Sequence, residues 1–131
     1  MYEETTRDVI IRVEPRYLPD QSTPDQGQYV WAYHVTIVNG GSRPVQLLRR
    51  HWIITDSLGR TQEVEGAGVV GETPTLSQGE QFEYTSGTPL ATASGFMGGT
   101  YLFRDLDSGE DFRATIPSFS LDSPHATGAV H

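Results

Sequence analysis

The chain has 131 residues, no cysteine and a formal net charge of −8, from 17 acidic and 9 basic side chains. This length fits one domain with one core, and the absence of thiols excludes disulfides, thiolate metal sites and cysteine nucleophiles. Every basic residue is an arginine, which excludes Schiff-base and P-loop lysines, and the acidic balance disfavours nonspecific binding to nucleic acid or anionic lipid.

The N-terminal part of the chain predicts two strands. The acidic stretch over 1–7 is not typical of a secretion signal, and no apolar run is long enough to cross a bilayer, so we expect a cytoplasmic protein without membrane insertion. Apolar residues alternate over 9–13, in a strand expected to end at Pro15, and a polar loop follows over 19–27. The clearest alternation predicts a long packed strand whose one face carries Tyr29, Trp31, Tyr33, Val35 and Ile37.

The third segment allows two interpretations. Three apolar residues over 45–52 have helical spacing, whereas 52–55 is strongly β-favouring. We favour a strand with a bulge near Arg49 and Arg50. In a strand, Arg50 points away from the face that carries Arg49 and His51, and we expect this basic cluster to pair with acidic side chains.

The C-terminal half predicts shorter strands near 61–64, around Phe82 and Tyr84, over 97–104 and over 112–116. We expect Pro117 to stop the strand over 112–116. Phe119 and Leu121 then form a last short strand or an apolar clip. About seven or more strands without a dependable helix predict an all-β, antiparallel sandwich. We expect the domain to span residues 1–122 and residues 123–131 to form a flexible C-terminal tail.

No metal site and no cofactor are predicted. Residues 105–111 resemble the start of a calcium loop, but Ile116 stands where such a loop needs a bidentate glutamate, so a hairpin turn is the better interpretation. The histidines lack metal-ligand spacing, and His34 is expected to have a side-chain partner within its strand. No catalytic motif occurs, and we expect no enzyme activity.

Several stretches in a fixed order and spacing resemble the ApaG family. They are Tyr29-x-Trp31-x-Tyr33-x-Val35-x-Ile37-x-Asn39, Val45-Gln46-Leu47-x-x-Arg50-x-Trp52-x-Ile54-Thr55-Asp56-x-x-Gly59, Val64-x-Gly66-x-Gly68-Val69-Val70-Gly71-Glu72-x-Pro74, Leu76-x-x-Gly79-x-x-Phe82-x-Tyr84-x-Ser86-Gly87, Leu90-x-Thr92, Gly95-x-Met97-x-Gly99-x-Tyr101 and Ile116-Pro117-x-Phe119-x-Leu121. The resemblance implies an immunoglobulin- or fibronectin-III-like sandwich in a bacterial cytoplasmic protein. It also implies an association with cobalt and magnesium tolerance or efflux, and an adaptor role through partner binding. No catalytic residues carry over from it.

The glycine-rich segment over 66–71 formally matches the Gly-x-Gly-x-x-Gly dinucleotide fingerprint. That fingerprint works only where a strand feeds a turn that opens a helix, and no helix-forming run follows here. We therefore favour a bend between extended segments, whose two valines plug inward or present an apolar tip to a partner. The candidate binding residues are Gly66, Gly68, Val69, Val70, Gly71 and Arg50.

The sequence thus predicts a non-catalytic binding or adaptor module whose partner is another protein, and a homodimer is compatible with it. The alternative is a small-ligand sensor that binds nucleotide or pyrophosphate at residues 66–71. A protein that handles metal directly is a third, weaker interpretation.

Overall fold

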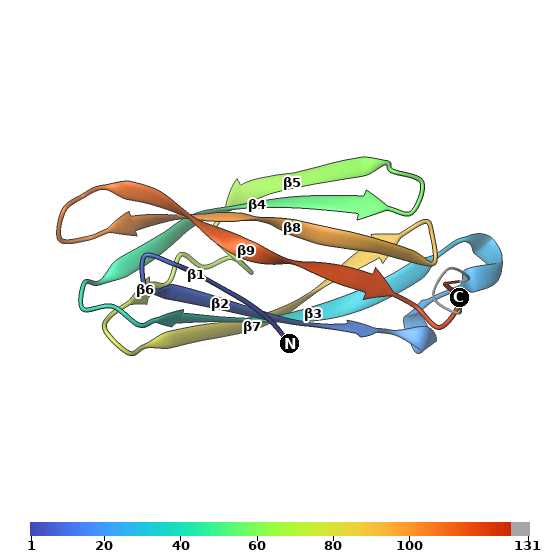
Figure 1. Cartoon of the computed structure of the whole chain (residues 1–131), viewed down its shortest axis with the longest axis horizontal. Helices are drawn as coiled ribbons and strands as arrows, with labels where there is room; N and C mark the ends of the chain where they lie inside the picture. The colour runs from blue at the N-terminus through green and yellow to red at the C-terminus, as the bar shows by residue number, and fades with distance from the viewer. Residues whose placement is uncertain (127–131) are drawn as a thin grey trace.

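The structure, a computed structural model, describes residues 1–126; residues 127–131 lie outside the described range. Two antiparallel sheets lie one above the other (Figure 1). The first has the order β1 (Tyr2–Thr6), β2 (Val9–Tyr17), β3 (Tyr29–Asn39) and β7 (Gln81–Leu90). The second has the order β5 (Thr61–Ala67), β4 (Val45–Asp56), β8 (Ser94–Asp105) and β9 (Asp111–Asp122), and β6 (Thr75–Leu76) also pairs with β4. Within residues 1–126, the helical segments are the 3₁₀ turns η1 (Pro19–Gln21) and η2 (Pro24–Gln26). The predicted all-β antiparallel sandwich is confirmed.

The core lies between the sheets and is rich in aromatic side chains. Trp31 and Tyr33 on β3 point inward, as their alternation predicts, and both are buried. The Tyr33 ring centroid lies 5.1 Å from that of Trp52 on the opposite sheet, and Phe119 on β9 packs 6.0 Å from the same tryptophan. The tilted Tyr33–Trp52 contact joins the two sheets across the core, whereas Trp52 and Phe119 belong to the same sheet.

Two strands continue through prolines that were expected to end them. β2 runs past Pro15 to Tyr17, because its neighbour β1 reaches only to Val13 and proline is tolerated at a free edge. β9 runs past Pro117, at a point where the β8–β9 register shifts between Met97 and Gly99. An irregularity in the ladder accommodates the missing N–H group.

The third segment is the strand β4, and the helical alternative is wrong. Its register against β8 shifts between Leu47 and Arg49, close to the predicted bulge. The beginning of the expected tail packs on the domain, since Ser123 and Ala126 are buried and Ser123 Oγ donates to the Ala93 carbonyl oxygen at 2.6 Å. The rest of the expected tail, 127–131, lies outside the described residues.

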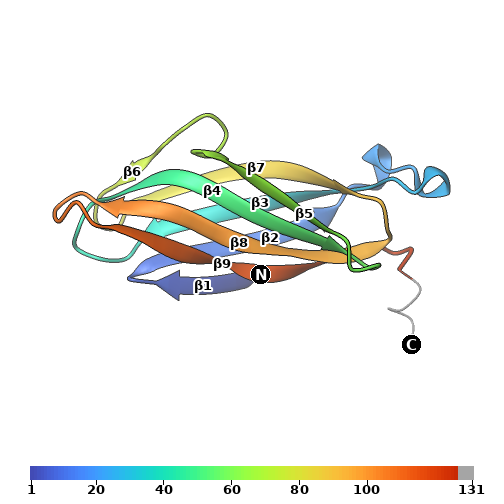
Figure 2. The same ribbon diagram turned by 90° about the horizontal axis from the view of Figure 1, so that it is seen from above.

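The two sides of the sandwich differ (Figure 2). On one side β1 bridges both sheets: Thr6 Oγ accepts a hydrogen bond from the Thr115 N–H at 3.2 Å, and the Tyr2 ring packs 6.0 Å from that of Phe119. On the other side β5 and β7 are the outermost strands of their sheets, and no strand among residues 1–126 pairs with their outer edges. We call this the open side. No helix of the described chain is long and apolar enough to span a membrane.

Candidate binding site

The glycine-rich segment is a bend between extended segments, as expected. Gly66 lies at the end of β5, and Val69 and Glu72 then close a tight turn through two hydrogen bonds, Val69 N–H to Glu72 O at 2.8 Å and Glu72 N–H to Val69 O at 2.9 Å. The chain continues to the short strand β6, without a helix. We call residues 66–72 the glycine hairpin. The helix N-terminus that would hold a pyrophosphate is missing after it.

Packing explains the first two glycines of the motif. A Cβ atom on Gly66 would lie 2.8 and 2.9 Å from the two terminal nitrogens of Arg50, so the guanidinium rests directly on the Gly66 backbone. A Cβ atom on Gly68 would lie 2.3 Å from the Glu72 carbonyl oxygen, and the φ of Gly68 is +63°. Gly68 therefore needs glycine to build the hairpin, whether or not a phosphate binds, whereas a side chain at Gly66 would displace the Arg50 guanidinium.

Arg50 ties the hairpin to β4. Its Nη1 donates to the carbonyl oxygens of Ala67 and Gly68, both at 3.0 Å. The structure thus brings Arg50 to the glycine hairpin, although through carbonyl groups and not through the acidic side chains that we expected. His51, on the other face of β4, does pair with acids: its Nε2 lies 2.7 Å from Glu63 Oε1.

Few hairpin N–H groups remain for an anion. The Gly68 N–H donates to the Leu48 carbonyl oxygen at 2.8 Å, and those of Val69 and Glu72 are used in the turn. An anion cradle needs several converging N–H groups, and the carbonyl oxygens that face Arg50 would repel a phosphate. Nucleotide binding at the hairpin stays a prediction, with little geometry in its favour.

The two valines of the hairpin have opposite environments. Val69 is 0% exposed and belongs to the core, whereas Val70 is 56% exposed at the tip. The φ of Val70 is +44° and that of Gly71 is +81°, the pattern of a type I′ turn. Asparagine and glycine favour such φ values, whereas for a β-branched residue they are outliers that cost free energy. The hairpin therefore presents one apolar side chain at a local energetic cost.

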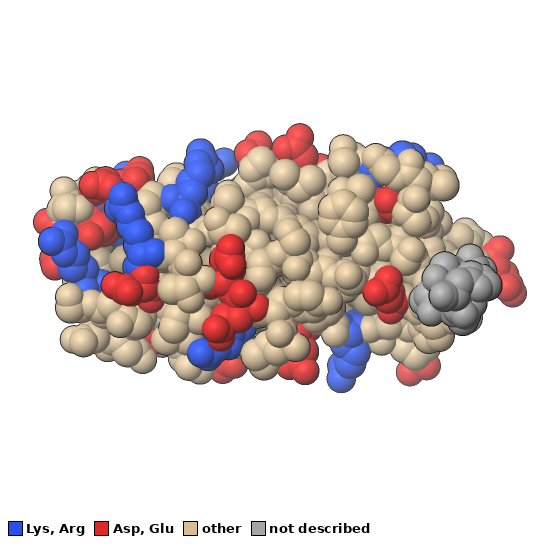
Figure 3. Space-filling model, in the orientation of Figure 1, with Lys and Arg blue, Asp and Glu red and all other residues tan. Residues whose placement is uncertain are grey.

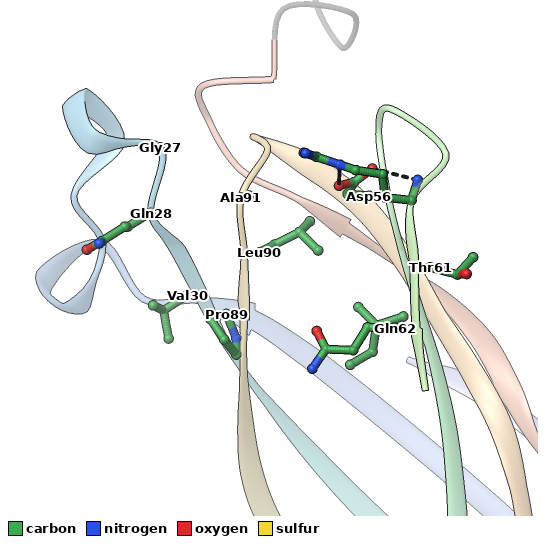
Figure 4. Close-up of a pocket in the computed structure, with 11 residues that line it drawn as sticks. Gly27, Gln28, Val30, Asp56, Thr61, Gln62, Pro89, Leu90 and Ala91 are labelled. Carbon is green, nitrogen blue, oxygen red and sulfur yellow. Dashed lines mark hydrogen bonds and ion pairs between the residues drawn. The ribbon is translucent and has the colours of Figure 1, made fainter. Parts of the chain in front are cut away.

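A recess opens beside the hairpin, between the edges of β5 and β7. Its cavity of about 220 Å³ has a floor and walls from both sheets, with Arg50, Trp52 and Tyr33 among the lining residues. It shares Gln62 with a larger cavity of about 540 Å³ at the end of the sandwich. Figure 4 shows the larger cavity, where the side chains of Gln62, from β5, and Leu90, from β7, point toward one another.

Asp56 stabilises the rim of the larger cavity. Its Oδ1 accepts hydrogen bonds from the backbone N–H groups of Leu58 and Arg60 at 2.9 and 3.0 Å, and its Oδ2 lies 2.7 Å from the Arg60 Nε (Figure 4). Burial by itself would raise the pKa of Asp56, but the hydrogen bonds and charge of Arg60 outweigh it and hold the pKa below the ordinary value.

Three tyrosines lie behind the recess. The hydroxyl groups of Tyr84 and Tyr101 are hydrogen bonded to each other, and Tyr33 lies on the neighbouring strand. Burial raises the pKa of all three phenols, and the nearby charge of Arg50 only partly opposes this rise. The phenols therefore stay neutral and cannot neutralise the guanidinium.

The remaining arginines are mostly paired. Figure 3 shows arginine and acidic side chains intermingled near the β8–β9 turn, where the structure has ion pairs between Arg7 and Glu110 and between Arg104 and Asp111. Pairs of this kind neutralise charge locally and bind little else. Among residues 1–126, Arg50 has no acidic partner, and neither do Arg16, Arg49 and Arg113.

The residues weighed as metal ligands have structural partners. Asp105 caps the predicted hairpin turn, since its Oδ1 accepts from the N–H groups of Asp107 and Ser108 at 2.9 and 3.1 Å. His34 has a side-chain partner, although on the neighbouring strand β7 and not within its own strand, with Nδ1 2.8 Å from Thr85 Oγ1. Within residues 1–126, no group of three or more histidine or carboxylate side chains is placed to hold a metal ion.

Sequence reasoning found the hairpin but missed the recess. The alternation of β4 already placed Arg50 on the inward face with Trp52, and that signal pointed into the sandwich. Gln62 and Ser86 line the recess only because β5 and β7 come to lie opposite each other, which no local pattern reveals.

Comparison with known proteins gives consistent matches over the whole chain. A family model described as the ApaG domain matches residues 19–105. A curated protein named Protein ApaG from Paramagnetospirillum magneticum is 62% identical over 125 residues, covering 95% of each chain. Another of that name, from Parvibaculum lavamentivorans, is 57% identical and covers 100% of each. A crystal structure of a Bordetella pertussis protein matches with a TM-score of 0.87 and 52% identity, covering 91% of this chain and 96% of that one.

Proposed function

The chain belongs to the ApaG family, and we propose that it acts as a non-catalytic protein-binding module that contacts its partner through the tip of the glycine hairpin. The observation that carries this proposal is Val70, a β-branched side chain exposed at a positive φ. Backbone strain is retained where it serves a function, and an exposed apolar side chain gains free energy by entering a pocket on a partner.

The hairpin is built to hold this side chain in place. Val69 anchors the turn in the core, and Arg50 fixes the preceding carbonyl groups from β4. A rigid support lowers the entropic cost of binding, because little conformational freedom is left to lose. The partner that fits is a folded protein with a small apolar pocket.

A role in cobalt or magnesium tolerance, which the family resemblance implies, would be exercised through the partner protein under this proposal. The alternative of a nucleotide or pyrophosphate sensor requires free N–H donors, and those of Gly68, Val69 and Glu72 are already used. We therefore place protein binding first.

The test compares affinity capture from the cell extract by three full-length proteins: the unchanged chain, Val70→Asn and Leu58→Asn. Asparagine suits a positive φ, so Val70→Asn removes the apolar tip and keeps the hairpin. Leu58 is the matched control, since it is also exposed, at 71%, on the β4–β5 turn. Val69 is left unchanged, because its replacement would damage the core.

We expect Val70→Asn to lose a captured protein that both the unchanged chain and Leu58→Asn retain. Identical capture by all three proteins would refute the hairpin contact. The sensor alternative is tested by adding millimolar pyrophosphate and following thermal unfolding, because a ligand at a hundredfold excess over its Kd stabilises by about 2.7 kcal/mol. No shift is expected, and a clear rise in Tm would favour the sensor.

A further inference from the structure

Arg50 has hydrogen-bonding capacity that the chain itself does not use. A guanidinium offers five N–H donors and keeps its charge at all physiological pH values. Only Nη1 has acceptors, the two carbonyl oxygens of Ala67 and Gly68, and among residues 1–126 neither Nε nor Nη2 has one. These spare donors are partly exposed beside a cavity, so they are available to an anionic ligand from outside the chain.

The recess gives this cation apolar walls. Trp52, Val64 and Met97 line it, together with the polar groups of Tyr33 and Ser86. Its cavity of about 220 Å³ is large enough for a benzene-sized group, for which about 150 Å³ suffices. A small inorganic anion would leave these apolar walls uncovered. The lining suits a carboxylate attached to an apolar body.

The strands that flank the recess favour a polypeptide as the source of that group. β5 and β7 both present outer edges that no strand of the described chain occupies, and an extended peptide can pair with such an edge. Pro89 removes one ladder donor from β7, which leaves β5 as the better template.

We propose that the recess binds the C-terminal carboxylate of a polypeptide whose last side chain is apolar. The carboxylate pairs with Nε and Nη2 of Arg50, the last side chain fills the space against Trp52 and Val64, and the preceding residues pair with the edge of β5. A C-terminal residue carries a carboxylate and an apolar side chain on the same Cα atom. This matches a recess in which the Arg50 charge lies next to apolar walls. This site does not involve Val70, so its test is independent of the test of the hairpin contact.

The test is an NMR titration of the ¹⁵N-labelled full chain with an acetylated hexapeptide ending in phenylalanine, as the free acid and as the C-terminal amide. We expect the free acid to shift the amide signals of residues 61–66 and the Arg50 Nε–H signal. The amide should bind at least about tenfold more weakly, because it lacks the charge-assisted pair. Equal binding of acid and amide would overturn the proposal.

Two variants locate the site. Ser86→Met fills the recess and leaves Arg50 and the hairpin intact, and it should lose binding. Thr85→Met is the matched control on the other face of β7, and it should bind as the unchanged chain does. Binding retained in Ser86→Met would contradict the assigned place.

Two further probes test the chemistry of the occupant. If N-acetylphenylalanine binds as tightly as the hexapeptide acid, the occupant is a small carboxylic acid and the polypeptide assignment is wrong. If inorganic pyrophosphate displaces the hexapeptide acid at a lower concentration than N-acetylphenylalanine does, the site recognises phosphate and the proposal fails. Weaker binding of both probes than of the hexapeptide supports it.

Discussion

At the scale of single residues, the unusual features gather at the glycine hairpin. Val70 has a φ of +44°, and although Arg7 and Asp8 also adopt positive φ values, neither of those is β-branched. The guanidinium of Arg50 lies against Gly66 and fixes the carbonyl groups that precede the tip. The strained Val70 side chain is thus exposed at the tip of a hairpin that Arg50 holds in place.

Because the Val70 backbone is strained, we expect this valine to lower the stability of the fold. Val70→Asn should raise the free energy of unfolding by about 1 kcal/mol, since Asn-Gly is the preferred pair in a type I′ turn. Urea unfolding of both proteins at neutral pH measures the difference. A variant that unfolds at a lower urea concentration would show that Val70 is not strained.

Asp56 predicts a pH dependence with a definite sign. Its folded pKa lies below the ordinary 3.8, so its carboxylate stabilises the fold above that pH, and the stabilisation is lost as the pH falls through the folded value. Asp56→Asn should therefore be less stable than the unchanged chain at pH 7, and the gap should shrink toward pH 3. Denaturant unfolding at both pH values measures it, and a constant gap would contradict the assigned cause.

At the scale of elements, the hairpin and β4 act as one unit, because the Gly66 backbone and the Arg50 guanidinium share the same space. Gly66→Ala would push the guanidinium away from the Ala67 and Gly68 carbonyl oxygens. The cost should be about 1–2 kcal/mol of unfolding free energy, the range of one or two lost hydrogen bonds.

A double-mutant cycle checks this coupling. In a chain that already carries Arg50→Ala, Gly66→Ala should cost much less, because no guanidinium remains to displace. The free energies of unfolding of the four proteins give the coupling term. Additive effects would mean that Gly66 is required for a reason other than Arg50.

Elements with strong local patterns could be predicted from the sequence, and their neighbours could not. The alternation over 29–39 gave β3 and its inward face, and the missing helix after residue 71 excluded a dinucleotide loop. β1 was missed because Tyr2–Thr6 carries little apolar alternation and forms by pairing with β2 and packing against β9. The course of β9 through Pro117 depends on its partner strand, which the local sequence does not encode.

At the scale of the whole molecule, the sandwich is asymmetric. β1 closes one side by bridging to β9, while on the other side no strand within residues 1–126 pairs with the outer edges of β5 and β7 (Figure 2). The glycine hairpin and the recess lie on that open side, where the hairpin exposes the Val70 side chain and the recess has apolar walls. Under both proposals, the open side is therefore the binding face.

Hydrogen–deuterium exchange of the chain, alone and with the protein that it captures, shows which side of the sandwich the partner covers. We expect slower exchange over residues 61–72 and 81–90 in the complex, with exchange over 2–6 and 111–122 unchanged, because a partner on the open side shields β5, the hairpin and β7. Protection confined to β1 and β9, with the open side exchanging as in the free chain, would contradict it.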